Sequence, residues 1–571
     1  MERRRADVLV IGTGGAGLRA AIAATEAGAT VLVVGKRGRR DAHTVLAAGG
    51  INAALGTVDP QDSWEQHFAD TYLEGYALGD PGVAEIMTRE APAAVRELAE
   101  WGCPFARLPD GRLDQRFFGA HRWRRTCYVA DSTGKAIIQT LADRAESLAI
   151  PIDERRQVSR LLVHDGRCAG ALSLDLRSGE RTAYEAGAVI VCGGGHTTLW
   201  RPNTSRTGEN YGEGIALALD AGCRLMDMEL VQFHPTGMVA PEDLAGTLVT
   251  EAVRGEGGRL FNALGERFME RYDPARMELS TRDRVAFANY TEIIEGRAGP
   301  NGGVFLDISH RGLEYILEKL PRMHKQFLSF QGLDISKDPM EVAPTAHYTM
   351  GGVVVEPETH ATDLPGLFAA GECAAGLHGA NRLGGNSLVD IVVFGRRAGE
   401  AAAALAAQDG IPDASAEARA ASDELDGMVN GGADPTELLR ELQDVMWRRC
   451  GVVRSLQGLE QGLMEVAGLA TSGPNAGEPA ALGRALDLRA AVLTAEATLR
   501  GAIERRETRG AHHRSEFPDT DPTLRVNFLI ARDPSTGRLE VTSRPVPDVS
   551  DELQGWLDQT PEMGLGDRLL E

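Results

Sequence analysis

A glycine-rich turn between an apolar strand and a helix is the feature that most constrains the fold of this chain. Residues 7–11 form a short, β-branched apolar run typical of a buried parallel strand. Residues 18–27 predict an alanine-rich helix that ends at Gly28, and a second apolar run follows at 31–34. The turn has the G-x-G-x-x-G spacing inside a complete strand–helix–strand unit, which predicts a Rossmann-like domain that binds a pyrophosphate at the helix N-terminus. Its glycines are Gly12, Gly14, Gly15 and Gly17.

The residue after the second strand narrows the choice of dinucleotide. NAD-binding domains usually carry an acidic residue there, and its carboxylate binds a ribose hydroxyl. This chain has Gly35 followed by Lys36 instead. The sequence therefore disfavours NAD as the dinucleotide.

Composition excludes several classes of partner. The formal net charge of −22 argues against binding to nucleic acid and against direct adhesion to an anionic membrane. No apolar run approaches the roughly 20 residues needed to cross a bilayer, and the N-terminus enters the first strand without the apolar region of a signal peptide. We therefore expect a cytoplasmic protein whose membrane association depends on partner subunits.

The cysteines also limit the chemistry of the chain. All seven are dispersed, and they include no C-x-x-C pair. Structural zinc and iron–sulfur sites need clustered ligands, so we expect reduced thiols and no metal site. An iron–sulfur cluster that exchanged electrons with this protein would lie on another chain.

The alternation of strands and helices breaks once in the middle of the chain, which predicts an inserted domain. A buried strand at 188–191 and a helix beginning near Ser387 belong to the parts on either side of the break. Helical periodicity dominates from 415 to about 508, and a strand pair is expected at 526–531 and 539–542. The predicted domains are a dinucleotide-binding domain in two parts (1–238 and 345–408), a capping domain (239–344), a helical domain (409–520) and a small C-terminal domain (521–571).

Four polar segments lie in or beside the predicted insertion. They are 232–237 at its entry, 250–258 with 280–283 inside it, 344–352 at its exit, and 378–390 in the dinucleotide-binding domain. Because His234 and His347 bracket the insertion, we expect both of its ends to return to one interface, and such interfaces are preferred ligand sites. Two histidines, two arginines and a threonine meeting there would neutralise and orient two carboxylates, since arginine pairs with a carboxylate through parallel hydrogen bonds.

A histidine, His43, followed by the paired glycines Gly49 and Gly50, marks the segment 41–52. This segment resembles the flavin-attachment loop of the flavoprotein subunits of succinate dehydrogenases and fumarate reductases. The four polar segments resemble those of the same family in the same order, and the likeness extends to Arg-Gly-Ala-His at 509–512, so it covers nearly the whole chain. The resemblance implies an α/β fold with a Rossmann-like FAD-binding domain, an inserted capping domain, a helical domain and a small C-terminal domain.

The resemblance also implies how the cofactor is held. FAD would be attached covalently through His43 to its 8α-methyl group. The implied FAD contacts are Gly12, Gly14, Gly15, Gly17, Lys36, His43, Thr44, Gly49, Gly50, Glu372, Ser387 and Leu388. Ala48 stands where the family commonly has a glutamine near the flavin, which leaves the flavin potential and the preferred direction of catalysis open.

The substrate site follows from the same resemblance, which implies interconversion of succinate and fumarate by hydride transfer at flavin N5. The implied carboxylate ligands are His347 and Arg382 for one carboxylate, and His234 and Thr250 for the other. The implied proton donor or acceptor is Arg282, with Glu251 and Arg254 relaying protons. The implied partners are membrane-anchor subunits that bind quinone, together with an iron–sulfur subunit. These partners would place the chain on the inner face of the cell membrane.

Two other functions share parts of this pattern. L-aspartate oxidase is a self-contained FAD enzyme with most of the same segments. Such oxidases generally lack the tethering histidine and carry Ala-Ser where this chain has Gly384 and Gly385, so His43 and the Gly-Gly pair favour the first hypothesis. An FAD-binding assembly or regulatory protein without chemistry is disfavoured by the complete set of histidines, arginines and threonine.

Overall fold

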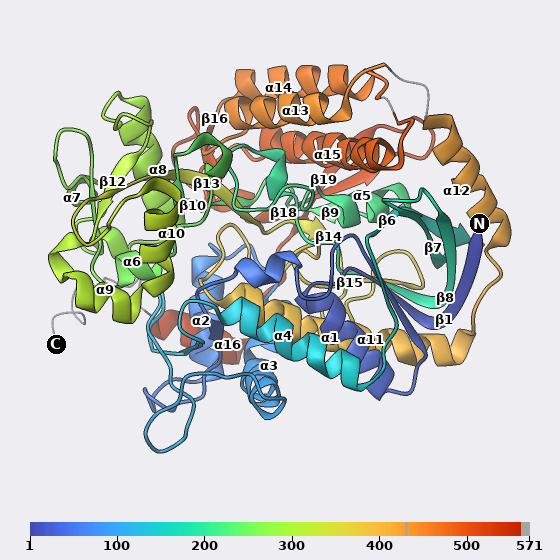
Figure 1. The fold of residues 1–571 in the computed structure, drawn as a ribbon, viewed down its shortest axis with the longest axis horizontal. Helices are drawn as coiled ribbons and strands as arrows, with labels where there is room; N and C mark the ends of the chain where they lie inside the picture. The colour runs from blue at the N-terminus through green and yellow to red at the C-terminus, as the bar shows by residue number, and fades with distance from the viewer. Residues whose placement is uncertain (429–431, 475, 561–571) are drawn as a thin grey trace.

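The structure is a computed structural model that describes residues 1–428, 432–474 and 476–560. Its central sheet is built from β1 Glu2–Ile11, β2 Val31–Gly35, β5 Ile152–Glu154, β6 Arg156–His164, β7 Arg167–Asp175, β8 Arg181–Val191 and β15 Leu367–Ala369. The strand order is β5-β2-β1-β8-β7-β6, with β15 also paired to β8 (Figure 1). The β1, β2, β5, β8 and β15 pairs are parallel, whereas β6 and β7 add antiparallel pairs at one edge. The predicted strand–helix–strand unit is therefore present.

Both faces of this sheet are covered, which explains the continuous apolar runs in its strands. Val8 and Val10 on β1 pack into a core on one face, and Leu9 and Ile11 pack into a second core on the other. The helices of the first core include α1 Gly15–Glu26, α3 Pro81–Glu100, α4 Thr133–Ser147 and α11 Asn386–Asp409. Those of the second are α5 Glu213–Asp220 and α15 Pro479–Glu504.

The capping segment, residues 239–344, extends a four-stranded sheet with the order β10-β13-β12-β11. Its strands are β10 Val231–Met238, β11 Arg259–Phe261, β12 Val304–Asp307 and β13 Met340–Thr349. Its helices are α6 Ala252–Gly255, α7 Met269–Tyr272, α8 Arg282–Ile294, α9 Leu313–Lys319 and α10 Pro321–Gln331. Antiparallel pairing of β10 with β13 brings the entry and the exit of the segment together, and Figure 1 shows the segment at one end of the molecule.

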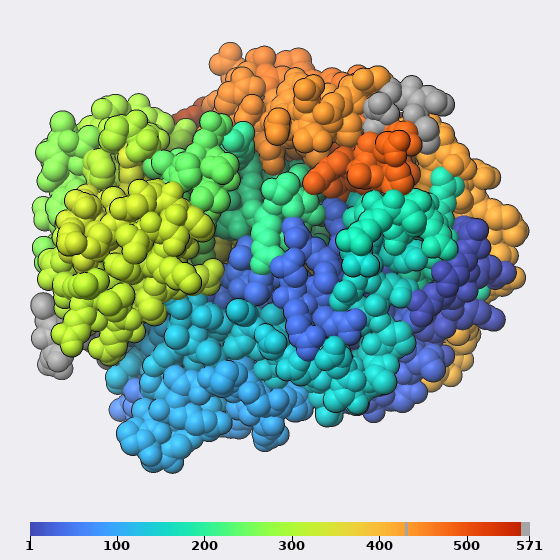
Figure 2. Space-filling model, viewed as in Figure 1, coloured from blue at the N-terminus to red at the C-terminus, as the bar shows by residue number. Residues whose placement is uncertain are grey.

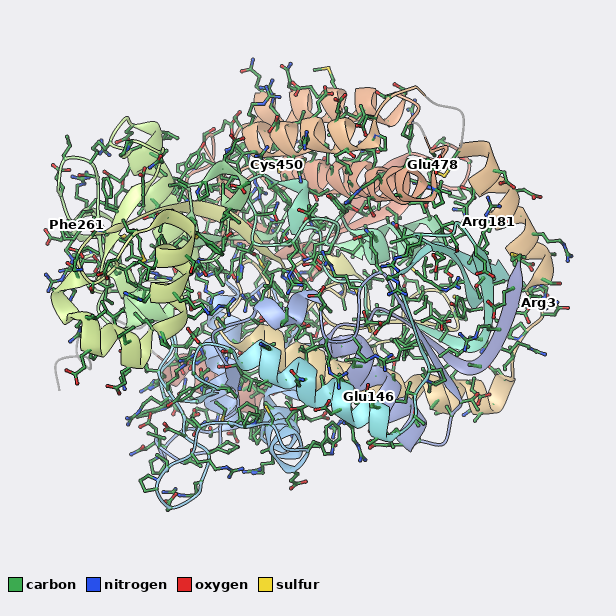
Figure 3. The ribbon with its side chains drawn as sticks, viewed as in Figure 1. Arg3, Glu146, Arg181, Phe261, Cys450 and Glu478 are labelled. Carbon is green, nitrogen blue, oxygen red and sulfur yellow. The ribbon has the colours of Figure 1, made fainter. Side chains whose placement is uncertain are left out.

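The helical region lies along one side of the central sheet (Figure 1). It contains α12 Ser415–Gly427, α13 Pro435–Arg449, α14 Leu456–Ala470 and α15, and the last three share an apolar core with Trp200. The indole Nε1 of Trp200 donates to the carbonyl of Cys450, 2.8 Å away, and Cys450 is labelled near α13 in Figure 3. This bond ties the helical region to the loop between β8 and α5.

The C-terminal hairpin is part of a shared sheet. Strands β18 Val526–Arg532 and β19 Leu539–Pro545 pair antiparallel, as the sequence predicts, and join β9 Leu225–Met226 and β14 Gly352–Val353 in the order β14-β9-β18-β19. The final helix, α16 Asp551–Gln559, packs on α2 Trp64–Glu74. The predicted C-terminal domain, 521–571, extends past the last described residue, Thr560.

The shorter elements and one buried ion cluster complete the fold. The short strands are β3 Ile51–Asn52, β4 Thr126–Cys127, β16 Val453–Arg454 and β17 His513–Arg514. The guanidinium of Arg505, fully buried, pairs with Glu229 (2.7 Å), Asp227 (3.2 Å) and Glu507 (3.2 Å) and so joins the end of α15 to the strands beside it. In the part of the chain that the structure describes, no helix combines the length and apolarity needed to cross a membrane.

Candidate functional site

A cavity of about 760 Å³ extends from the glycine turn before α1 to the pair of strands that lead into and out of the capping segment. Figure 2 shows the yellow-green capping segment lying against the blue N-terminal segments. The predicted site residues that border the cavity are Gly12, Gly14, Gly15, Lys36, His43, Thr44, Gly49, Gly50, His234, Thr250, Glu251, Arg282, His347, Glu372, Arg382, Ser387 and Leu388. Gly17 and Arg254 lie behind its wall.

The glycine turn is shaped for close approach of a phosphate. A Cβ on Gly12 would lie 2.2 Å from the carbonyl oxygen of Cys192, and one on Gly17 would lie 1.9 Å from the carbonyl oxygen of Gly12, so both positions need glycine for strand–helix packing. A Cβ on Gly14 would instead meet nothing closer than the Thr44 hydroxyl at 3.6 Å, so the backbone there faces open space. With α1 beginning at Gly15, this is the anion site that a pyrophosphate needs.

Lys36 lies at the same end of the cavity and contacts the helical region. Its ammonium pairs with Glu213 at 3.0 Å and with Asp487 on α15 at 2.5 Å. Gln157 also donates to Asp487, at 2.8 Å. Asp487, which lies 451 residues further along the chain, therefore holds Lys36 from behind this part of the wall.

Residues 43–50 form the next stretch of wall. The hydroxyl of Thr44 accepts from the backbone N–H of Gly15 at 3.1 Å, which ties this segment to the glycine turn. Gly49 and Gly50 are packed tightly, because a Cβ would lie 2.6 Å from the ring of Phe118 and 2.4 Å from the methyl group of Thr126. No side chain fits at these two positions, so the backbone of residues 49–50 forms this part of the cavity wall.

His234 and His347 meet at the opposite end, where β10 pairs with β13. Their ring centroids are 5.1 Å apart. Nδ1 of His347 bonds to the hydroxyl of Thr204 at 2.9 Å, and Nδ1 of His234 lies 3.1 Å from the carbonyl oxygen of Thr236. Within the described residues neither Nε2 has a hydrogen-bond partner. Both histidines border the cavity, so each Nε2 is available to a ligand bound there. Burial lowers the pKa of both histidines well below the usual value. The charge of Arg282 lowers the pKa of His234 further, and the neighbouring ring of His234 does the same for His347.

Two guanidinium groups face the histidines and share one acceptor. The side-chain oxygen of Gln232 accepts from Arg282 at 3.0 Å and from Arg382 at 3.1 Å. Arg282, the first residue of α8, also donates from Nε to Glu251 at 2.7 Å. Burial and the charge of Arg282 lower the pKa of Arg382 to about 9, because two cations share a site with few anions.

Glu251 is the carboxylate of this cluster. Burial, the largest influence, raises the pKa of Glu251, but the charges of Arg282 and Arg254 outweigh it and bring the pKa down to about 2. Arg254 lies 3.9 Å from Glu251 and donates to the carbonyl of Glu278 at 2.6 Å. Arg282 is thus hydrogen-bonded to Glu251, whereas Arg254 lies at ion-pair distance from it. Thr250 borders the cavity beside these groups.

Some residues of the site were not singled out from the sequence. Gln232 lies in the motif around His234, and its proximity to the histidine is the signal that could have identified it. Tyr348, whose ring lies 4.3 Å below the guanidinium of Arg382, neighbours His347 in the same way. Glu209, which bonds to His43, and Asp487, which bonds to Lys36, carry no local signal because their partners are distant in sequence.

The site combines two kinds of surface. One end has a glycine turn of the kind that binds a dinucleotide and the glycine pair 49–50, and the other has two buried cations and two imidazoles. Excess positive charge in a low-dielectric pocket favours a small dianion. The arrangement can therefore place a dicarboxylate against a planar redox cofactor.

Comparison with known proteins agrees with this geometry. Residues 7–388 match the family described as FAD binding domain, and residues 439–552 match the family described as fumarate reductase flavoprotein C-term. The chain is 45% identical to one of the subunits of the fumarate reductase (CoM/CoB) of Methanothermobacter marburgensis, over 93% of this chain and 98% of that protein. It is 35% identical to the succinate dehydrogenase flavoprotein subunit of Rickettsia bellii, over 96% of each chain.

A solved structure shows the same architecture. A variant of the FrdA chain of E. coli quinol fumarate reductase superposes with a TM-score of 0.90 at 34% identity, covering 96% of this chain and 98% of that one. The predicted α/β fold and the FAD cofactor are thereby confirmed. The chain belongs to the family of FAD-dependent succinate dehydrogenase and fumarate reductase flavoprotein subunits.

Proposed function

We propose that this chain interconverts succinate and fumarate and passes the electrons to an iron–sulfur partner subunit. The observation that carries the proposal is the shared acceptor Gln232, which holds Arg282 and Arg382 on the same side of a cavity that continues to the dinucleotide turn. Two fixed cations and two unpartnered imidazole nitrogens among the described residues match the four oxygens of a C4 dicarboxylate. L-aspartate oxidase is not favoured by the relatives.

The proposed roles of the polar residues are those that the family resemblance implies. His347 and Arg382 bind one carboxylate, and His234 and Thr250 bind the other. The fixed positive charge draws electron density from the bond between the central carbons, which makes a carbon of fumarate a better hydride acceptor. FAD, when bound, supplies or accepts the hydride.

Arg282 is the proposed proton donor for fumarate reduction and acceptor for succinate oxidation. Its Nε is hydrogen-bonded to Glu251 at 2.7 Å, so Glu251 is the proposed next group of a proton relay. Arg254, 3.9 Å from Glu251, is the proposed group after it and must move closer to pass a proton. The capping segment carries Arg282 and Glu251, and His234 lies on the strand that enters it. We propose that the segment acts as a lid, because its closure completes the site and excludes water.

The flavin is proposed to be attached to His43, which borders the cavity. The proposed partners are membrane-anchor subunits that bind quinone, together with an iron–sulfur subunit, and they would hold the chain at the inner face of the cell membrane. The name of the E. coli relative, a quinol fumarate reductase, supports a quinone. The name of the Methanothermobacter relative, fumarate reductase (CoM/CoB), supports CoM and CoB as second candidates for the electron partner.

Steady-state assays with artificial electron carriers test the reaction without its partners. The purified, FAD-loaded chain should reduce fumarate with a reduced viologen dye and oxidise succinate with an oxidised dye. L-aspartate should be inactive. Oxidation of aspartate without activity toward succinate or fumarate would overturn the proposal in favour of the oxidase.

A further inference from the structure

A buried carboxylate is bonded to the ring of His43. Nδ1 of His43 lies 3.0 Å from Oε1 of Glu209, which comes from the loop before α5. The side chain of Glu209 is 9% exposed, and it is anchored by Nε of Arg37 at 2.9 Å and by the backbone N–H of Arg206 at 3.2 Å. Glu209 thus has a fixed position, whereas the His43 side chain is 27% exposed and borders the cavity.

This contact determines which ring nitrogen carries the proton. An ionised carboxylate only accepts hydrogen bonds, so Nδ1 of His43 must be the donor. In the neutral ring Nε2 then has the free electron pair. Nε2 has no hydrogen-bond partner among residues 1–428, 432–474 and 476–560, and His43 borders the cavity, so its electron pair is available to a bound ligand.

Other charged groups also act on the ring. Burial, the largest influence, lowers the pKa of His43, but the hydrogen bond and charge of Glu209 outweigh it, and the result is a raised pKa. Glu372 raises the pKa further and Arg206 lowers it. The charge that His43 carries when it is protonated also lowers the pKa of His347. Glu209 is the only one of these groups that is hydrogen-bonded to the ring among the described residues.

We propose that Glu209 is a positioning residue for flavin attachment: it holds His43 with the proton on Nδ1 and presents Nε2 as the nucleophile for the 8α-carbon of FAD. This inference rests on the proposed covalent attachment at His43. The step is balanced, because oxidised flavin plus neutral histidine contains the same atoms as the joined flavin in its two-electron-reduced form. A proton leaves the methyl carbon, and the electron pair of the broken carbon–hydrogen bond reduces the flavin ring. The electron pair of Nε2 then forms the nitrogen–carbon bond, and the reduced ring takes up the methyl proton and the proton that Nδ1 releases. Fumarate oxidises the joined flavin, takes up these two hydrogens and becomes succinate.

The attachment rate of the full-length chain provides the test. Apoprotein is incubated with FAD and fumarate, samples are denatured in acid, and flavin fluorescence is measured at the mass of the chain on a gel. Extraction of the non-covalent flavin gives the total bound FAD for each variant. The variants are Glu209→Leu, which removes the acceptor, and Glu209→Gln, which keeps an acceptor oxygen without the charge. Asp243→Asn is the matched control, because Asp243 borders the same cavity without a bond to His43.

We expect Glu209→Leu to slow attachment about tenfold or more at the pH of the maximal rate, since a hydrogen bond to a charged group is lost. Asp243→Asn should match the unsubstituted protein. The rate should also fall at acid pH, where Nε2 becomes protonated. Because Glu209 raises the pKa of His43, the acid limb should move to lower pH in both Glu209 variants, an effect that a merely structural role would not produce.

The outcomes separate the two proposals. If the unsubstituted chain binds FAD but gives no fluorescent band, covalent attachment itself is wrong and the role of Glu209 falls with it. If the unsubstituted chain gives the band and both Glu209 variants show the same rate and the same acid limb, only the role of Glu209 is overturned. If Glu209→Leu fails to bind FAD, the position of the acid limb in Glu209→Gln decides the question.

Discussion

Gln232→Leu is the substitution that most directly tests how the two arginines are held. The amide oxygen of Gln232 accepts from Arg282 at 3.0 Å and from Arg382 at 3.1 Å, and its side chain is fully buried. A hydrogen bond to a charged group contributes about 1.5–3 kcal/mol. In Gln232→Leu both arginines lose this acceptor, but a bound substrate carboxylate can accept from one of them. We therefore expect the transition state to lose the equivalent of one hydrogen bond. This corresponds to a roughly 10- to 150-fold decrease in kcat/KM.

The assay is fumarate reduction with a reduced viologen dye, after the FAD content of each protein has been measured. Gln326→Leu is the control, because Gln326 borders the same cavity but donates to the carbonyl of Leu248 and contacts neither arginine. FAD content should be unchanged in both proteins. An unchanged kcat/KM in Gln232→Leu would refute the reasoning, as would an equal loss in the control.

Three further predictions follow from the geometry. Arg382→Lys should weaken dicarboxylate binding, measured by the flavin absorbance change, because the bidentate contact is lost. Arg282→Gln should abolish turnover and leave that binding nearly intact. A comparable loss of binding in both variants would show that the roles are misassigned. His234 and His347 are neutral at pH 7 because burial lowers the pKa of each, and a bound carboxylate raises it, so dicarboxylate affinity should fall as pH rises through the raised value. Calorimetry in buffers of different ionisation enthalpy should show proton uptake, and zero uptake would contradict this. Arg505→Met should lower the thermal unfolding temperature and cost about 3–5 kcal/mol, since it leaves buried carboxylates unpaired; an unchanged unfolding temperature would contradict it.

The parts of the fold that were predictable from sequence are those encoded locally. The turn at Gly12–Gly17 could be predicted because its glycines are required by contacts within one strand–helix–strand unit, such as the 1.9 Å approach of a Gly17 Cβ to the carbonyl of Gly12. The C-terminal strand pair was likewise visible in local alternation and turn residues. Its incorporation into a sheet with β9 and β14 was not, because that pairing joins segments that are far apart in the chain.

The same distinction applies to the site. His234 and His347 could be expected to meet because they bracket an insertion, and the pairing of β10 with β13 brings their rings to 5.1 Å. The role of Gln232 depends on Arg382, 150 residues further along, and no periodicity reports that contact. Glu209 lies 166 residues from His43 in a loop without regular structure, so only the folded chain reveals the pair.

Anaerobic stopped-flow absorbance of the FAD-loaded chain tests the central claim most directly. Substrate and flavin are proposed to bind in one cavity, and hydride passes directly between them. Succinate should therefore reduce the oxidised flavin, and so bleach it, without any partner protein. Succinate deuterated on its central carbons should bleach it more slowly, and fumarate should restore the colour of the reduced flavin. A flavin that neither succinate bleaches nor fumarate reoxidises, in protein shown to contain FAD, would contradict the account.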